Sequence, residues 1–204
     1  MLHMTDGNGS SARKLLIIIM MGIILAGAAA GTAVYSKMSG EMLDAMSGII
    51  PSADRSGYGD IGILNAAVRS FRVTAAFLLA VFLLGFGTVY QPLTAAVMLF
   101  RGIGIGTAMA HVYCTAAQGS GGTLLPAMFI PDAAAASLII AAGAAESVMF
   151  SGQNARILFL SDGAAVRPQP DVRLYMLRFA VLMAAAALWS LADGLICTAV
   201  SSYL

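Results

Sequence analysis

The feature that most constrains the fold is an uninterrupted apolar stretch near the start of the chain. Residues 15–35 read LLIIIMMGIILAGAAAGTAVY, without a charged side chain, and they directly follow Arg13 and Lys14. As an α-helix, this stretch is about 30 Å long, which matches the hydrocarbon core of a bilayer. A cleaved signal peptide is the alternative interpretation, but its apolar region is shorter, about 7–15 residues. We therefore predict a retained transmembrane helix here.

The whole chain has the composition of an integral membrane protein. Of its 204 residues, 59% are hydrophobic and only 10% are charged, whereas about 25% of the residues in soluble domains are charged. A net charge of +1 provides no basic surface for nucleic acid. Two cysteines and two histidines are too few for a disulfide framework, a metal cluster or a set of catalytic partners. We therefore expect a protein that is not an enzyme and that holds no cofactor or metal.

Further apolar stretches predict an all-α membrane bundle of about five transmembrane helices. We expect a polar tail, residues 1–14, and then a single helical domain, residues 15–204. The expected spans are residues 15–35, 73–88, 93–113, 123–150 and 174–200. The second and third spans are so close in sequence that they should form a tight antiparallel hairpin. Pro92 fits the first turn of the third span, where its missing N–H is not needed.

The fourth span differs from the others because Pro131 and Asp132 lie near its start. Proline breaks or kinks helices, and we expect a short re-entrant or interfacial piece, residues 124–129, followed by a main helix that begins at Asp132. The Asp132 carboxylate would then cap this main helix. Many alanines, together with Gly143, make the span thin, which is typical of a helix at the centre of a bundle.

Two long connections determine the expected orientation. The first, residues 36–72, contains Met38, Met42 and Met46 at helical spacing, which predicts a short amphipathic helix on the membrane surface. The second, residues 151–173, is rich in arginine. Because basic loops stay in the cytoplasm, we expect a cytoplasmic N-terminus and 151–173 loop. The 36–72 loop and the C-terminus should then be extracytoplasmic.

Ionisable side chains inside the spans are the candidate functional groups, because burying a charge in the bilayer is costly. They are Arg101, Asp132, Glu146 and Asp193. Two interpretations of Arg101 stay open: it forms an ion pair with Glu146, or it extends to the lipid headgroups. As an alternative function, Arg101, Asp132 and Glu146 would line the path of a small channel, a transporter or a permease subunit.

Small residues predict where the helices pack against each other. Gly27 and Gly31 in the first span have the small-xxx-small spacing that permits close helix packing. Next to Arg101, Gly102, Gly104 and Gly106 also leave room for another backbone, and they lack the GxGxxG spacing of a nucleotide-binding turn. Cys114 and Cys197 both lie near the outer ends of their spans, where two free thiols or a disulfide would fit.

The spacing of Gly85, Pro92, Arg101-Gly102 and Gly106 resembles the core of the stage II sporulation protein M family. The similarity includes residues 65–85 and extends more weakly to residues 129–131 and 138–145. Arg101 stands where the family usually has lysine, and Asp132 is followed by four alanines where many relatives have histidine or glutamate.

The resemblance implies a non-enzymatic membrane protein of endospore formation. In this family the protein acts as a scaffold at the septal or engulfing membrane. Its partners are two peptidoglycan-remodelling proteins, the stage II sporulation proteins D and P. Self-association is compatible with this role.

Overall fold

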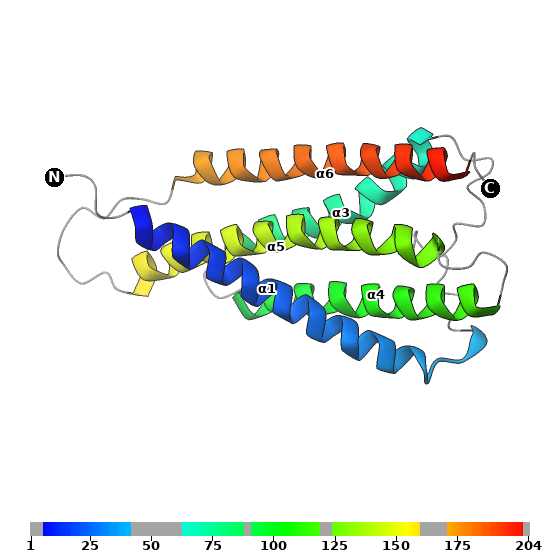
Figure 1. Cartoon of the computed structure of the whole chain (residues 1–204). Helices are drawn as coiled ribbons and strands as arrows, with labels where there is room; N and C mark the ends of the chain where they lie inside the picture. The colour runs from blue at the N-terminus through cyan, green and yellow to red at the C-terminus, as the bar shows by residue number, and fades with distance from the viewer. Residues whose placement is uncertain (1–5, 42–62, 88–90, 119–123, 160–170, 202–204) are drawn as a thin grey trace.

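A computed structural model describes residues 6–41, 63–87, 91–118, 124–159 and 171–201, and five long helices account for most of them, with no strand in this part of the chain (Figure 1). They are α1 (Asp6–Tyr35), α3 (Ile63–Gly85), α4 (Gln91–Gln118), α5 (Leu124–Phe159) and α6 (Val172–Ser201). Four of these helices are long and apolar enough to cross a membrane, which confirms the predicted all-α membrane bundle. The apolar part of α3, Ser70–Gly85, is shorter.

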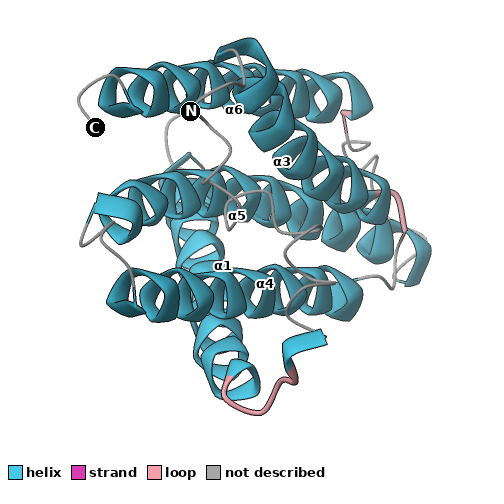
Figure 2. Ribbon diagram, turned by 90° about the vertical axis from the view of Figure 1, so that its right-hand side faces the viewer, coloured by secondary structure: helices cyan, strands magenta, loops and turns pink. Residues whose placement is uncertain are grey.

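The α5 helix lies at the centre of the bundle, between α1 and α4 on one side and α3 and α6 on the other (Figure 2). It contacts all four of these helices, and its residues Ile140, Ala141, Ala144 and Ala145 are completely buried. The prediction of a thin central helix is therefore confirmed. Successive helices alternate in direction, so α1, α4 and α6 begin at one end (Figure 1). We call this end proximal and the opposite end distal.

The most extensive interface joins α1 to α4, and here the two backbones are in direct contact. A Cβ atom added to Gly27 would lie 2.5 Å from the carbonyl oxygen of Leu99, and one added to Gly102 would overlap the carbonyl oxygen of Ile24. Gly31 and Gly106 meet the backbones of Ile103 and Ala28 in the same way. By contrast, a Cβ on Gly104 would meet nothing within 4 Å. The crossing therefore depends on four of these glycines and not on Gly104.

The α1 helix begins at Asp6 and therefore includes residues 6–14 of the expected polar tail. Residues 6–14 continue the apolar helix toward its N-terminus. A helix that has already formed is extended at little cost, since each further residue adds one hydrogen bond. The extension carries Arg13 on the same helix as the membrane span, and this determines which groups Arg13 can reach.

The expected break at Pro131 and the separate piece before it are wrong, because α5 is one helix from Leu124 to Phe159 with Pro131 inside it. Proline removes only one N–H donor, and membrane helices tolerate it where neighbouring groups satisfy the freed carbonyl. Asp132 consequently lies within the helix and does not cap it. Its carboxylate is instead available to a neighbouring helix.

The connection between α3 and α4 is short, as predicted, and Pro92 lies in the first turn of α4. These two helices nevertheless make the least extensive of the helix contacts, and α3 packs mainly on α6 and α5. Closeness in sequence therefore does not make α3 and α4 a packing unit. The long connections are shorter than expected, since α3 begins at Ile63, α5 ends at Phe159 and α6 begins at Val172. The predicted surface helix around Met42 and Met46 lies outside the described residues.

Candidate functional site

At the proximal end of the bundle, one buried carboxylate connects three helices. Glu146 of α5 forms an ion pair with Arg13 of α1, in which Nε of the arginine lies 2.7 Å from Oε1. It forms a second ion pair with Arg178 of α6, in which a terminal nitrogen of the arginine lies 2.6 Å from Oε2. The Glu146 side chain is 10% exposed, whereas each arginine is 39% exposed. We call these three residues the charge triad. Its two guanidinium groups and one carboxylate carry a net single positive charge.

The two ion pairs of the charge triad differ in geometry. Arg178 donates a well-formed hydrogen bond to Glu146. The Nε of Arg13 is equally close to the carboxylate, but its N–H does not point along the contact, and this buried atom has no hydrogen-bond partner. The Arg178 pair is therefore the more directional of the two, and the Arg13 pair is mainly Coulombic.

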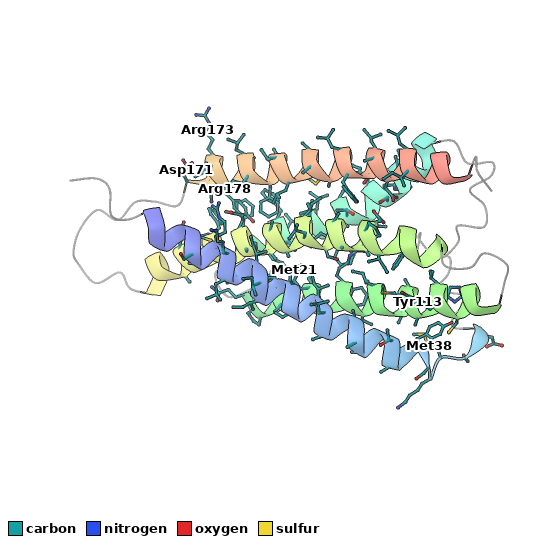
Figure 3. All side chains as sticks on the ribbon, viewed as in Figure 1. Met21, Met38, Tyr113, Asp171, Arg173 and Arg178 are labelled. Carbon is teal, nitrogen blue, oxygen red and sulfur yellow. The ribbon has the colours of Figure 1, made fainter. Side chains whose placement is uncertain are left out.

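The beginning of α6 places its basic side chains on opposite faces. Arg178 is directed toward α5 and α1, while Arg173 points away from the bundle (Figure 3). Asp171 precedes the helix, and its Oδ1 accepts a hydrogen bond of 3.2 Å from the N–H of Leu174, so it acts as the N-cap of α6. The carboxylate of Asp171 thus serves the end of its own helix.

Beside the charge triad, five aromatic rings from α3, α5 and α6 form one cluster. The ring of Tyr175 is stacked between Phe82 and Phe150, with centroid distances of 5.3 and 4.2 Å, and Phe86 and Phe179 contact it through their edges or at a tilt. The hydroxyl of Tyr175 donates a hydrogen bond of 2.9 Å to the carbonyl oxygen of Phe82. We call this the aromatic cluster.

The aromatic cluster explains why Gly85 lacks a side chain. A Cβ at Gly85 would overlap the Tyr175 hydroxyl and would lie 3.1 Å from Oγ of Ser147. Only glycine lets the tyrosine ring extend so far across α3. Nearby, Ser151 Oγ donates to the carbonyl oxygen of Gly87 at 2.5 Å, which ties α5 to the residues just after α3.

Further into the bundle, Arg101 and Asp132 lie close enough for the carboxylate to stabilise the guanidinium charge. Arg101 also lies over the ring of Phe77, 5.2 Å from its centroid, which is a cation–π distance. Asp132 Oδ1 accepts a hydrogen bond of 3.2 Å from Nε1 of Trp189. The Nε of Arg101 is buried and has no hydrogen-bond partner. Four helices, α3 to α6, therefore contribute to this second polar group.

The predicted ion pair between Arg101 and Glu146 is wrong, because Glu146 pairs with Arg13 and Arg178. The physical reason is the position of each group along the bundle. Glu146 lies level with the first turns of α1 and α6, whereas Arg101 lies deeper and next to Asp132 and Phe77. The alternative interpretation, in which Arg101 extends to the headgroups, stays a prediction.

At the distal end, the Tyr35 hydroxyl of α1 and Nδ1 of His111 on α4 are 3.3 Å apart. Cys114, one turn further along α4, is exposed and free. Among the described residues α4 and α6 do not contact each other, and the side chain of Cys197 lies outside them. In the described part of the chain, no three histidine, cysteine or acidic residues form a group that would hold a metal ion.

Four members of these groups were not predicted from the sequence: Arg13, Arg178, Tyr175 and Trp189. From the sequence, Arg13 was only a charge next to the first span. A usable signal was present in α6, where Tyr175, Arg178, Phe179 and Leu182 follow the helical spacing of one face. An arginine on an otherwise apolar inner face indicates a buried acidic partner.

Comparison of the chain with protein-family models, curated proteins and solved structures found no match.

Proposed function

We propose that this protein is a non-enzymatic scaffold of the cell membrane that acts in endospore formation and localises peptidoglycan-remodelling proteins at the septal or engulfing membrane. One observation carries the proposal: the spacing of Gly85, Pro92, Arg101-Gly102 and Gly106, which resembles the stage II sporulation protein M family. By the same resemblance, the proposed partners are the stage II sporulation proteins D and P.

The positions of these residues in the bundle support a scaffold. Gly85 makes room for Tyr175, and Gly102 and Gly106 let α4 contact the backbone of α1. Pro92 begins α4. Each residue serves the relative placement of helices, and a scaffold needs a constant shape more than it needs reactive groups.

The proposed orientation has the proximal end in the cytoplasm. Basic residues gather within the first three turns of α1 and α6, at this end: Arg13, Lys14, Arg173 and Arg178. Basic residues next to transmembrane helices favour the cytoplasmic side. The five alternating helices then place the end of α6 on the extracytoplasmic side, where peptidoglycan is remodelled.

A second candidate function is a small channel, transporter or permease subunit. The observation in its favour is the buried Arg101 Nε without a hydrogen-bond partner, beside Asp132. Intramembrane ionisable groups are frequent along ion and proton pathways. Against it, Glu146 is occupied by two arginines, and so it is not free to take part in a pathway.

Deletion of the gene in its native host, followed by membrane-dye microscopy during sporulation, tests the proposal. We expect engulfment to stop, and a wild-type copy to restore it. A copy with Gly106→Ala, which disturbs the α1–α4 crossing, should restore it poorly. The matched control is Gly104→Ala on the same helix, where the added methyl group meets nothing within 4 Å. Normal engulfment with an altered solute phenotype would favour the transport function instead.

A further inference from the structure

We propose that the charge triad is the binding site for the phosphate headgroup of an anionic phospholipid, held between α1 and α6. This inference is independent of the proposed role in sporulation. It rests on three observations at the proximal end: an excess of positive charge, unused donors on both arginines, and two helices that do not pack on each other.

The charge of the triad is not balanced. Arg13 and Arg178 share a single carboxylate, that of Glu146, so one positive charge is left over. The neighbouring acid does not compensate for it, because the carboxylate of Asp171 caps the N-terminus of α6. Arg173 and Lys14 are exposed nearby and add further positive charge.

Both arginines have N–H donors that the Glu146 carboxylate does not use. A guanidinium has five N–H donors, and in the triad Arg178 donates one of them to Glu146. In Arg13 the buried Nε lies against the Glu146 carboxylate, so the terminal N–H groups are its donors for a ligand. Each side chain is 39% exposed, so its remaining N–H groups are accessible. A phosphate can use donors from both guanidinium groups, because its oxygens accept several hydrogen bonds at once.

The charge triad lies between two helices that do not pack on each other. In the described part of the chain, the backbones of α1 and α6 do not contact each other, and each packs on its own partners (Figure 1). Arg13 reaches Glu146 from one side and Arg178 from the other, with α5 beneath them. The adjoining turns expose large apolar side chains, Leu15 and Ile18 on α1 and Leu177 and Val181 on α6. A ligand here needs a phosphate head and an apolar tail, and an anionic phospholipid has both.

The depth of the triad agrees with this ligand. Arg13 immediately precedes the apolar stretch of α1, and Arg178 lies within the second turn of α6. These positions correspond to the boundary between headgroups and hydrocarbon. Basic pockets between transmembrane helices at this level recognise anionic headgroups. A zwitterionic headgroup has the same phosphate, but its ammonium group opposes the positive charge of the site.

The test measures which lipids the full-length protein retains. The protein is purified in neutral detergent, mixed with equal amounts of dioleoylphosphatidylglycerol and dioleoylphosphatidylcholine, and analysed by native mass spectrometry. These two lipids have the same acyl chains and differ only in the headgroup. We expect phosphatidylglycerol to be retained preferentially. Equal retention of the two lipids would overturn the proposal.

Variants of the triad locate the binding site. Arg178→Gln should lower the preference for phosphatidylglycerol about fivefold, which is the effect of one basic residue at the membrane surface. The variant keeps the Arg13–Glu146 pair and is therefore expected to fold. Arg173→Gln is the matched control, because this arginine is on the same helix but points away from the bundle (Figure 3). If both variants lose the preference for phosphatidylglycerol equally, the lipid is attracted by any surface charge, and the assignment of the site to the charge triad is wrong.

Glu146→Gln tests the same site in the opposite direction. It removes the only carboxylate of the triad and frees both arginines, so the preference for phosphatidylglycerol should rise about fivefold. A triad that only holds helices together would show no increase in lipid retention, and that result would overturn the proposal.

Inorganic phosphate distinguishes the source of the ligand. At the same concentration as the lipid, it should leave the thermal unfolding midpoint unchanged, whereas phosphatidylglycerol should raise it. If inorganic phosphate raises the midpoint as much as phosphatidylglycerol does, the ligand is a soluble phosphate and the lipid assignment is wrong.

Discussion

The α1–α4 crossing and the proximal region of α3, α5 and α6 hold helices together in opposite ways. At the crossing, glycines let the backbones of α1 and α4 touch directly. In the proximal region, large aromatic rings and the charge triad fill the space between helices. Within a membrane, helices gain little from burying apolar surface, because lipid is equally apolar. Close van der Waals contact and polar pairing remain as the two sources of stability, and this protein uses one in each region.

The glycines of the two regions differ in the kind of atom that they contact. Gly102 and Gly106 contact backbone, which cannot move away without shifting a whole helix. Gly85 contacts mainly the hydroxyl end of Tyr175, which is a side chain, although its ring is held between two phenylalanines. The crossing should therefore tolerate an added methyl group less well than the aromatic cluster does.

Gly106→Ala should produce the largest loss of stability. Its Cβ would overlap the carbonyl oxygen of Ala28, and the next nearest atoms, at 2.7 and 2.8 Å, also belong to the Ala28 backbone. Overpacking of this kind lowers the free energy of unfolding by about 1–3 kcal/mol. The thermal unfolding midpoint of the purified protein in detergent measures the effect.

The control for this prediction is Gly104→Ala. Since its Cβ would meet nothing within 4 Å, only the better helix propensity of alanine acts, and stability should be unchanged or rise by up to about 1 kcal/mol. Equal losses in Gly104→Ala and Gly106→Ala would show that the crossing does not depend on close backbone contact.

Gly85→Ala should have a smaller effect, about 1–2 kcal/mol, because a side chain can give way more easily than a backbone. The sharper test combines it with Tyr175→Phe. Alone, Tyr175→Phe removes the hydrogen bond to the Phe82 carbonyl and should lower the free energy of unfolding by about 0.5–1.5 kcal/mol. In the Gly85→Ala background it also removes the overlapping hydroxyl, so it should raise stability. If Tyr175→Phe destabilises both backgrounds equally, Gly85 does not serve to accommodate the tyrosine.

Double-mutant cycles at Glu146 should give the smallest energies of these predictions. They distinguish most directly whether Glu146 pairs with Arg178 or with Arg101. Glu146→Ala combined with Arg178→Ala should show a coupling of about 1 kcal/mol, because the two side chains share a hydrogen bond and the arginine is partly exposed. Glu146→Ala combined with Arg101→Ala should be additive. A coupling to Arg101 as large as that to Arg178 would contradict the charge triad and restore the ion pair predicted from the sequence.

Much of the architecture could be predicted from the sequence, because it depends on properties that act along one helix. A run of apolar residues long enough to cross a bilayer becomes a helix whatever surrounds it, since its backbone must bond internally. The alanines of α5 imply a central position, and Gly102 and Gly106 imply a close neighbour, for the same local reason. The sequence alone therefore determined the membrane class, the apolar helices and the alanine and glycine faces on which those helices pack.

The polar contacts could be decided only by the tertiary structure. Whether Arg101 or Arg178 reaches Glu146 depends on the rotation and the vertical offset of three helices, and a few ångströms separate an ion pair from none. The same applies to Trp189, which bonds to Asp132 because α5 continues through Pro131 and presents that carboxylate to α6. Apolar length is a property of one segment, whereas the partner of a charge is a property of the whole bundle.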